Sequence, residues 1–176
     1  MKKIFFSLSL LFTVAIAHAQ NFPDSYTDGK YVTVDGAKLY VVLVGKGDPL
    51  IIIPGGPGGA HPGYRAFDSL AKDNQIIYFD AFGRGKSDTA KDVKEYTLAR
   101  DIEDIEGLRK ALHLDKLNVL GHSYGGVVAQ GYALKYPGHV NHLILEIRFT
   151  AISCGKKMTT TAIMRSLPII RKCGIR

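Results

Sequence analysis

The chain has 176 residues, 46% of them hydrophobic and 22% charged, which suits one domain with a real core and is short for two. Its formal net charge of +7 does not indicate a nucleic-acid-binding protein, because residues 1–146 carry 16 basic and 16 acidic side chains. The whole excess lies in residues 147–176, which hold seven basic residues, no acidic residue and both cysteines.

Residues 1–19 have the layout of a secretory signal peptide. Two lysines precede an apolar run, and Ala17 and Ala19 bracket a small-x-small cleavage site. The apolar run is interrupted by serine and threonine and is short for a membrane span of roughly 20 residues. We therefore expect cleavage after about Ala19, export to the periplasm or out of the cell, and no membrane partner for the mature chain.

Strand and helix signals alternate from residue 30 onward. A hairpin turn is expected at Asp35-Gly36, and Thr97 can cap a helix with apolar residues at i, i+4, i+7, i+10 and i+14. Strands apolar on both faces, alternating with helices, predict a mostly parallel sheet covered on both sides, with an antiparallel edge formed by the first two strands. Predicted strands fall in runs 30–36, 38–48, 49–59, 74–85, 116–120 and 141–147, and predicted helices in 63–73, 96–114 and 125–137.

A "GKS" sequence in the glycine-rich turn "FDAFGRGKSD", residues 79–88, suggests a nucleotide-binding loop. Such a loop needs a glycine five residues before Gly85, and Asp80 stands there. Its carboxylate would repel phosphates and occupy the space needed by the loop backbone. We interpret the turn as structural, with Asp80 and Arg84 tying loops together.

A second turn, "GHSYGG", places Ser123 between a strand and a helix in a G-x-S-x-G pattern. In this arrangement a nucleophilic serine occupies a sharp, strained turn, relieved by Gly121 and Gly125. The amide of Tyr124 would be one donor to an oxyanion. The other would come from the loop "PGGPGGAHPG", residues 54–63, whose glycines leave backbone N–H groups accessible.

The segments "IIIPGGPGG", "YFDAFGRGKSD", "GHSYGG" and "YPGHVNHLIL" together resemble the amino-terminal half of an α/β-hydrolase, and most closely the proline iminopeptidases and related serine aminopeptidases. The resemblance covers residues 31–146. The loop of that group usually reads H-G-G-P-G, and Pro54 takes the place of the histidine here. The resemblance implies Ser123 as nucleophile, the amides of Gly56 and Tyr124 as oxyanion donors, a small peptide or ester as substrate, and no metal or cofactor.

The catalytic partners of Ser123 are harder to find. In this fold the order is serine, then acid, then histidine. Only His139, His142 and Glu146 follow, and both histidines are expected at the opposite edge of the sheet because a helix separates them from Ser123. Glu146 is a candidate acid at the end of its strand. Two histidines lie nearer in sequence, and we interpret His61 as a loop or pocket residue and His122 as a packing residue.

Residues 147–176 form a basic tail in which neither structural period is sustained. A frameshift or truncation in the gene would explain this loss together with the charge bias, both cysteines and the missing triad, whereas a genuine short variant would use the tail for binding. A disulfide between Cys154 and Cys173 is compatible with export. We expect a sheet that ends after its sixth strand, an exposed edge there, and an inactive serine hydrolase. The alternatives are an esterase or lactonase on the same scaffold, or a catalytically dead binding module.

Overall fold

The computed structural model describes residues 29–153 and 156–164, and side chains as far as residue 146. The predicted signal peptide, Cys154 and Cys173 lie outside the described residues. Within the described ranges, no helix has both the length and the apolar character that crossing a membrane requires.

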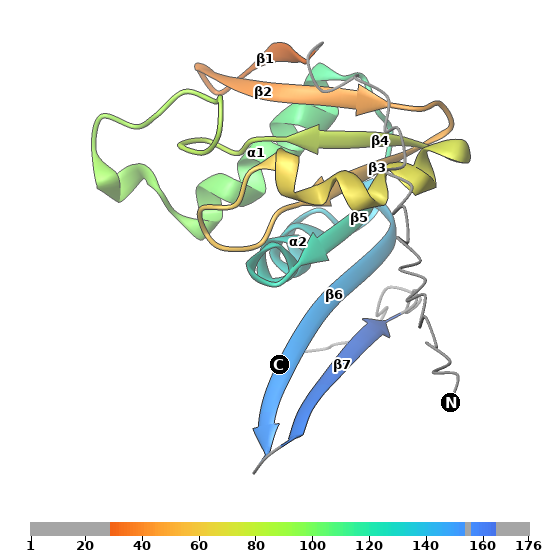
Figure 1. Ribbon diagram of the computed structural model, residues 1–176. Coiled ribbons are helices and arrows are strands. Elements are labelled where there is room, and N and C mark those ends of the chain that lie inside the picture. Colours follow the sequence, from red (N-terminus) through yellow and green to blue (C-terminus); the bar gives the residue numbers. More distant parts are fainter. Residues whose placement is uncertain (1–28, 154–155, 165–176) are drawn as a thin grey trace, which may run out of the picture.

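One sheet with the strand order β1-β2-β4-β3-β5-β6-β7 organises the molecule (Figure 1). Strands β4, β3, β5 and β6 run parallel, while β2 pairs antiparallel with β4 and β1 pairs antiparallel with β2. This confirms the predicted parallel sheet with an antiparallel edge, and the turn joining β1 to β2 has positive φ at both Asp35 and Gly36. The strands are β1 Lys30–Val34, β2 Ala37–Val44, β3 Asp48–Ile53, β4 Asn74–Phe79, β5 Leu117–His122, β6 Val140–Ser153 and β7 Lys156–Met164.

Helices cover both faces of the sheet. Alternate residues along each central strand point to opposite sides, so Ile51 and Ile77 pack with α1 and α2, while Ile52 and Ile76 pack with η2. The long helices are α1 Leu98–Ala111 and α2 Tyr124–Lys135, and the 3₁₀ segments are η2 His61–Lys72, η3 Val93–Glu95 and η4 Pro137–His139. The three predicted helices are present, the first of them as 3₁₀ turns.

The amino end of α1 follows the predicted pattern. The Thr97 hydroxyl accepts a hydrogen bond from the Arg100 amide at 3.1 Å, which satisfies one of the free N–H groups of the first turn. Ile105 and Leu108 of the apolar stripe are fully buried, whereas Leu98 is 40% exposed. The predicted apolar stripe is therefore buried in its middle and partly exposed at its first residue.

Regular structure continues past Ile147, the last residue of the predicted strands. Strand β6 continues to Ser153 and pairs antiparallel with β7, from Leu145 opposite Met164 to Ser153 opposite Lys156. Together β6 and β7 form a ribbon that leads away from the rest of the sheet (Figure 1). Residues 148–164 hold no sustained alternation of apolar and polar residues, so periodicity gave no signal for this pairing. Over the described residues, β7 is a seventh strand of the sheet, and the β6 edge that we expected to be exposed is paired over residues 145–153.

Candidate active site

Ser123 occupies a strained turn between β5 and α2. Its φ of 52° and ψ of −118° lie in a region that residues with a side chain rarely adopt, and the residue is exposed. The turn is held on both sides, since the Ser123 amide donates to the Glu146 carbonyl at 3.0 Å and the Gly126 amide donates to the Ser123 carbonyl at 2.9 Å. Strain concentrated at one exposed serine is the geometry that the G-x-S-x-G pattern predicts.

The flanking glycines of this turn are required by close backbone packing. A Cβ at Gly125 would lie 2.6 Å from the Pro54 carbonyl oxygen and closer still to that of Ile53. A Cβ at Gly121 would fall 2.6 Å from the Gly125 carbonyl carbon. The turn therefore presses directly against the carboxyl end of β3.

The loop after β3 lies beside Ser123. Strands β3 and β5 are parallel neighbours with Ile53 opposite Gly121, so the segments that follow them meet at one edge of the sheet. A Cβ at Gly55 would come within 3.0 Å of the Ser123 Cβ. The chain leaves β3 toward η2 and β4 on one side and leaves β5 toward α2 and β6 on the other, so this edge is a topological switch point, where α/β proteins bind ligands.

The backbone amides of this loop differ in their partners. The Gly55 amide donates to the Tyr64 hydroxyl at 2.5 Å, and the Gly59 amide donates to the Gly55 carbonyl at 3.1 Å. Among the residues that the structure describes, the amide of Gly56 has no hydrogen-bond partner. Gly56 also has φ +107°, which glycine adopts without penalty. This exposed amide follows Gly55, which lies beside Ser123, and is a donor of the kind an oxyanion needs.

The Asp80 carboxylate holds together the glycine loop and the turn of residues 79–88. Its fully buried carboxylate accepts hydrogen bonds from the His61 amide at 2.9 Å, the His61 Nδ1 at 2.8 Å and the Lys86 amide at 2.9 Å. Burial raises the pKa of Asp80, but the bonds from His61 and Lys86 outweigh it and hold the pKa below its ordinary value. The predicted structural role of Asp80 is confirmed, and His61 is a buried partner of this carboxylate.

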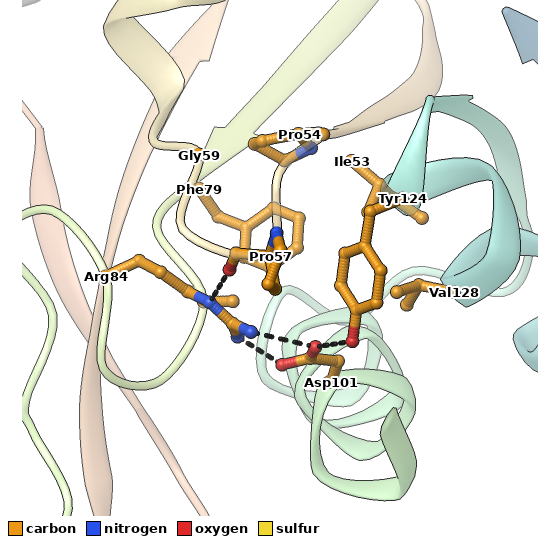
Figure 2. A pocket seen from close by; sticks show the side chains of 11 residues that line it. Ile53, Pro54, Pro57, Gly59, Phe79, Arg84, Asp101, Tyr124 and Val128 are labelled. Atoms are coloured by element: carbon orange, nitrogen blue, oxygen red, sulfur yellow. Dashed lines mark hydrogen bonds and ion pairs between the residues drawn. The ribbon is translucent and has the colours of Figure 1, made fainter. Parts of the chain in front are cut away.

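Arg84 joins three elements around a small cavity (Figure 2). Its Nε donates to the Pro57 carbonyl at 2.6 Å, and its two terminal nitrogens donate hydrogen bonds to the Asp101 carboxylate of α1. The Tyr124 hydroxyl donates to the same carboxylate at 2.7 Å, and burial together with Asp101 raises the pKa of Tyr124 to about 12. The cavity holds about 20 Å³, room for about one water molecule. The predicted loop-tying role of Arg84 is confirmed.

The remaining histidines and Glu146 lie as follows. His142 pairs with Asn118 at the amino end of β5, and His139 contacts Glu106 at 3.1 Å, so both sit away from Ser123 as predicted. Glu146 is opposite His122, beside the serine turn, and half-buried. The prediction that Glu146 ends its strand is wrong, because pairing with β7 prolongs β6 by seven residues to Ser153.

Two side chains of the site escaped sequence reasoning. Tyr64 bonds both Gly55 and His122, the latter at 2.9 Å through Nδ1, so His122 has a polar partner as well as packing contacts. Asp101 sits at a buried position of α1, 4% exposed. An acidic residue next to the apolar stripe was the one available signal, since buried carboxylates need partners. No group of three or more metal-ligating side chains occurs within the described part of the chain.

Comparison with known proteins gives a consistent picture. The family described as alpha/beta hydrolase fold matches residues 48–147. The proline iminopeptidase of Heyndrickxia coagulans is 36% identical over 124 residues, covering 69% of this chain and 43% of that enzyme, and that of Saccharolobus solfataricus is 35% identical over 127 residues, covering 69% and 41%. The structure of a proline iminopeptidase-related protein from Thermus thermophilus superposes with a TM-score of 0.62 at 31% identity, covering 66% of this chain and 43% of that one. The chain spans about two fifths of the length of the curated relatives named here.

Proposed function

The chain belongs to the α/β-hydrolase fold family, and from this premise we propose that it is a serine hydrolase similar to proline iminopeptidases, with Ser123 as its nucleophile. The observation that carries the proposal is the exposed, strained Ser123 packed against a glycine loop whose Gly56 amide has no partner within the described residues. Backbone strain at an exposed residue does not stabilise a fold, and an open backbone amide beside it suits acyl transfer.

In the proposed reaction the Ser123 hydroxyl attacks the carbonyl carbon of an amide or ester. As the C–O bond forms, the hydroxyl proton passes to a base and the carbonyl electrons move onto oxygen. The amides of Gly56 and Tyr124 donate to that oxyanion, aided by the positive end of α2. The amine or alcohol then leaves with a proton, and water releases the acyl group from Ser123.

Within the described residues, no hydrogen bond joins a histidine to the Ser123 hydroxyl. His61 is bonded to Asp80, His122 to Tyr64, His139 to Glu106 and His142 to Asn118. A serine without a base is a poor nucleophile at neutral pH. We propose that these residues by themselves bind substrate and turn it over weakly or not at all, which also gives the second candidate function, a catalytically dead binding module.

Substrate class and location are further proposals. Identities of 36% and 35% to two proline iminopeptidases favour a peptide with an amino-terminal proline over an ester. The sequence of residues 1–19 favours export to the periplasm or the medium. Fractionation of cells that express the full chain would test whether the protein is exported.

A fluorophosphonate probe tests the nucleophile. We expect slow, covalent labelling of the folded chain, mapped by mass spectrometry to Ser123 and abolished in Ser123→Ala. Proline arylamide and simple aryl ester substrates, offered at the same concentration, compare the two enzyme classes. A chain that is folded by circular dichroism and takes up no probe would contradict the hydrolase proposal and favour the binding module.

A further inference from the structure

We infer that Tyr64 and Arg84 are positioning residues that hold the two proposed oxyanion donors at a fixed separation, an inference that rests on the proposed role of Ser123. Each forms the middle of a side-chain tether. The Tyr64 tether connects Gly55 to His122, and the Arg84 tether connects Pro57 to Tyr124 through Asp101.

The Tyr64 tether runs through one hydroxyl group. Tyr64 Oη accepts the Gly55 amide at 2.5 Å and lies 2.9 Å from His122 Nδ1, so a single oxygen bonds both segments. The Tyr64 ring is itself held, stacked on Phe67 with ring centres 6.3 Å apart and set edge-on to His122 at 5.6 Å. A hydroxyl on an anchored ring fixes the start of the loop relative to the end of β5.

The Arg84 tether runs through an ion pair. The side chains of Arg84 and Asp101 are only 11% and 5% exposed. The planar guanidinium bonds the carboxylate with two nitrogens while its Nε reaches the Pro57 carbonyl, a geometry that lysine cannot reproduce. Because the Tyr124 hydroxyl bonds the same carboxylate, the loop and the first residue of α2 share one anchor.

The two tethers have matching end points. They start at Gly55 and Pro57, the neighbours of Gly56, and they finish at His122 and Tyr124, the neighbours of Ser123. The Gly56 backbone, which has no side chain of its own to pack, is thereby fixed from both sides relative to the serine. Oxyanion donors act within about 2.7–3.1 Å of the oxygen, so displacement of the loop by 1 Å would greatly slow acyl transfer.

The test compares Tyr64→Phe and Arg84→Lys with Tyr136→Phe in the full chain. Tyr136 is the matched control, since its hydroxyl bonds Glu103 beyond the far end of α2. We expect Tyr64→Phe and Arg84→Lys to speed amide hydrogen exchange of Gly55 and Gly59, and to slow phosphonylation of Ser123, each about tenfold, as for one lost hydrogen bond. The urea midpoint of unfolding should stay close to that of Tyr136→Phe.

Chemical rescue separates positioning from general support of the fold. In Arg84→Ala, guanidinium ion at low millimolar concentration should restore part of the phosphonylation rate, and it should not affect Tyr64→Phe. Phosphonylation of both variants at the wild-type rate would overturn the inference. Where the wild type itself takes up no probe, faster exchange in both variants would support the tethers and contradict the proposed function, and unchanged exchange would overturn the tethers.

Discussion

Replacing Gly125 with alanine tests whether the serine turn must press against β3. The new Cβ would lie 2.6 Å from the Pro54 carbonyl oxygen and 2.8 Å from the Ile53 carbonyl carbon, where ordinary contact begins at 3.4 Å. The obstructing atoms are backbone at the end of β3, which is paired on both sides by β4 and β5 and cannot rotate away. The turn and the glycine loop must therefore separate by several tenths of an ångström or more.

The adjacent glycine provides the control. A Cβ at Gly126 would meet the Gly121 carbonyl oxygen at 3.5 Å and Leu145 Cδ2 at 3.8 Å, which is ordinary contact. Both substitutions gain similar helix propensity, so the difference between them isolates the close approach. Overpacking of this kind costs about 1–3 kcal/mol, and that is the expected difference in free energy of unfolding.

Urea unfolding at pH 7 measures that difference, with equal m-values required for the comparison. Phosphonylation of Ser123 supplies the second measurement. A displacement approaching 1 Å between serine and loop should slow the reaction on the order of 10²-fold in Gly125→Ala, while Gly126→Ala should react near the wild-type rate. Equal stability and equal labelling of the two variants would refute the argument that packing against β3 positions the serine.

Three further predictions concern the cap of α1, the Glu106 carboxylate and the Gly56 amide. Thr97→Ala should lower the free energy of unfolding by about 1 kcal/mol and Thr97→Ser by less, as the hydroxyl caps α1; equal losses would contradict the capping role. Burial raises the pKa of Glu106, but bonds from Arg109, Tyr132 and His139 outweigh it and lower the pKa to about 2. Since this folded-state pKa lies below the ordinary 4.5, the bonds contribute fully above pH 4.5, and about 3 kcal/mol is lost as pH falls toward 2. Glu106→Gln should flatten that pH dependence, measured by urea unfolding between pH 2 and 6, and a steep loss in the variant would exclude Glu106 as its source. Gly56→Ala, with φ +107° and a Cβ only 2.7 Å from two backbone nitrogens of the loop, should lose Ser123 labelling with the sheet intact by circular dichroism; normal labelling would exclude the Gly56 amide as a donor.

Local signals in the sequence predicted the main elements. The Asp35-Gly36 turn, the Thr97 cap and the glycines around Ser123 each depend on a few neighbouring residues, and all three are present in the structure. The pairing of β6 with β7 could not be predicted in this way, because residues 148–164 hold no sustained alternation of apolar and polar residues.

The polar contacts of the site were harder to predict from the sequence than the helices and strands. Tyr64 and Asp101 acquire their roles from partners 58 and 23 residues away in the chain, and periodicity carries no information about such pairs. Asp104 is a similar case, buried completely in α1 and bonded to the Phe82 amide at 2.8 Å. Local sequence patterns identify neither the burial of these acids nor their partners.

A crystal structure of the phosphonylated chain measures the central geometry directly. The phosphoryl oxygen of a Ser123 adduct imitates the oxyanion of acyl transfer. We predict that this oxygen lies within about 2.7–3.1 Å of the backbone nitrogens of both Gly56 and Tyr124. An adduct whose oxygen points to solvent, or which contacts only one of the two amides, would contradict the account.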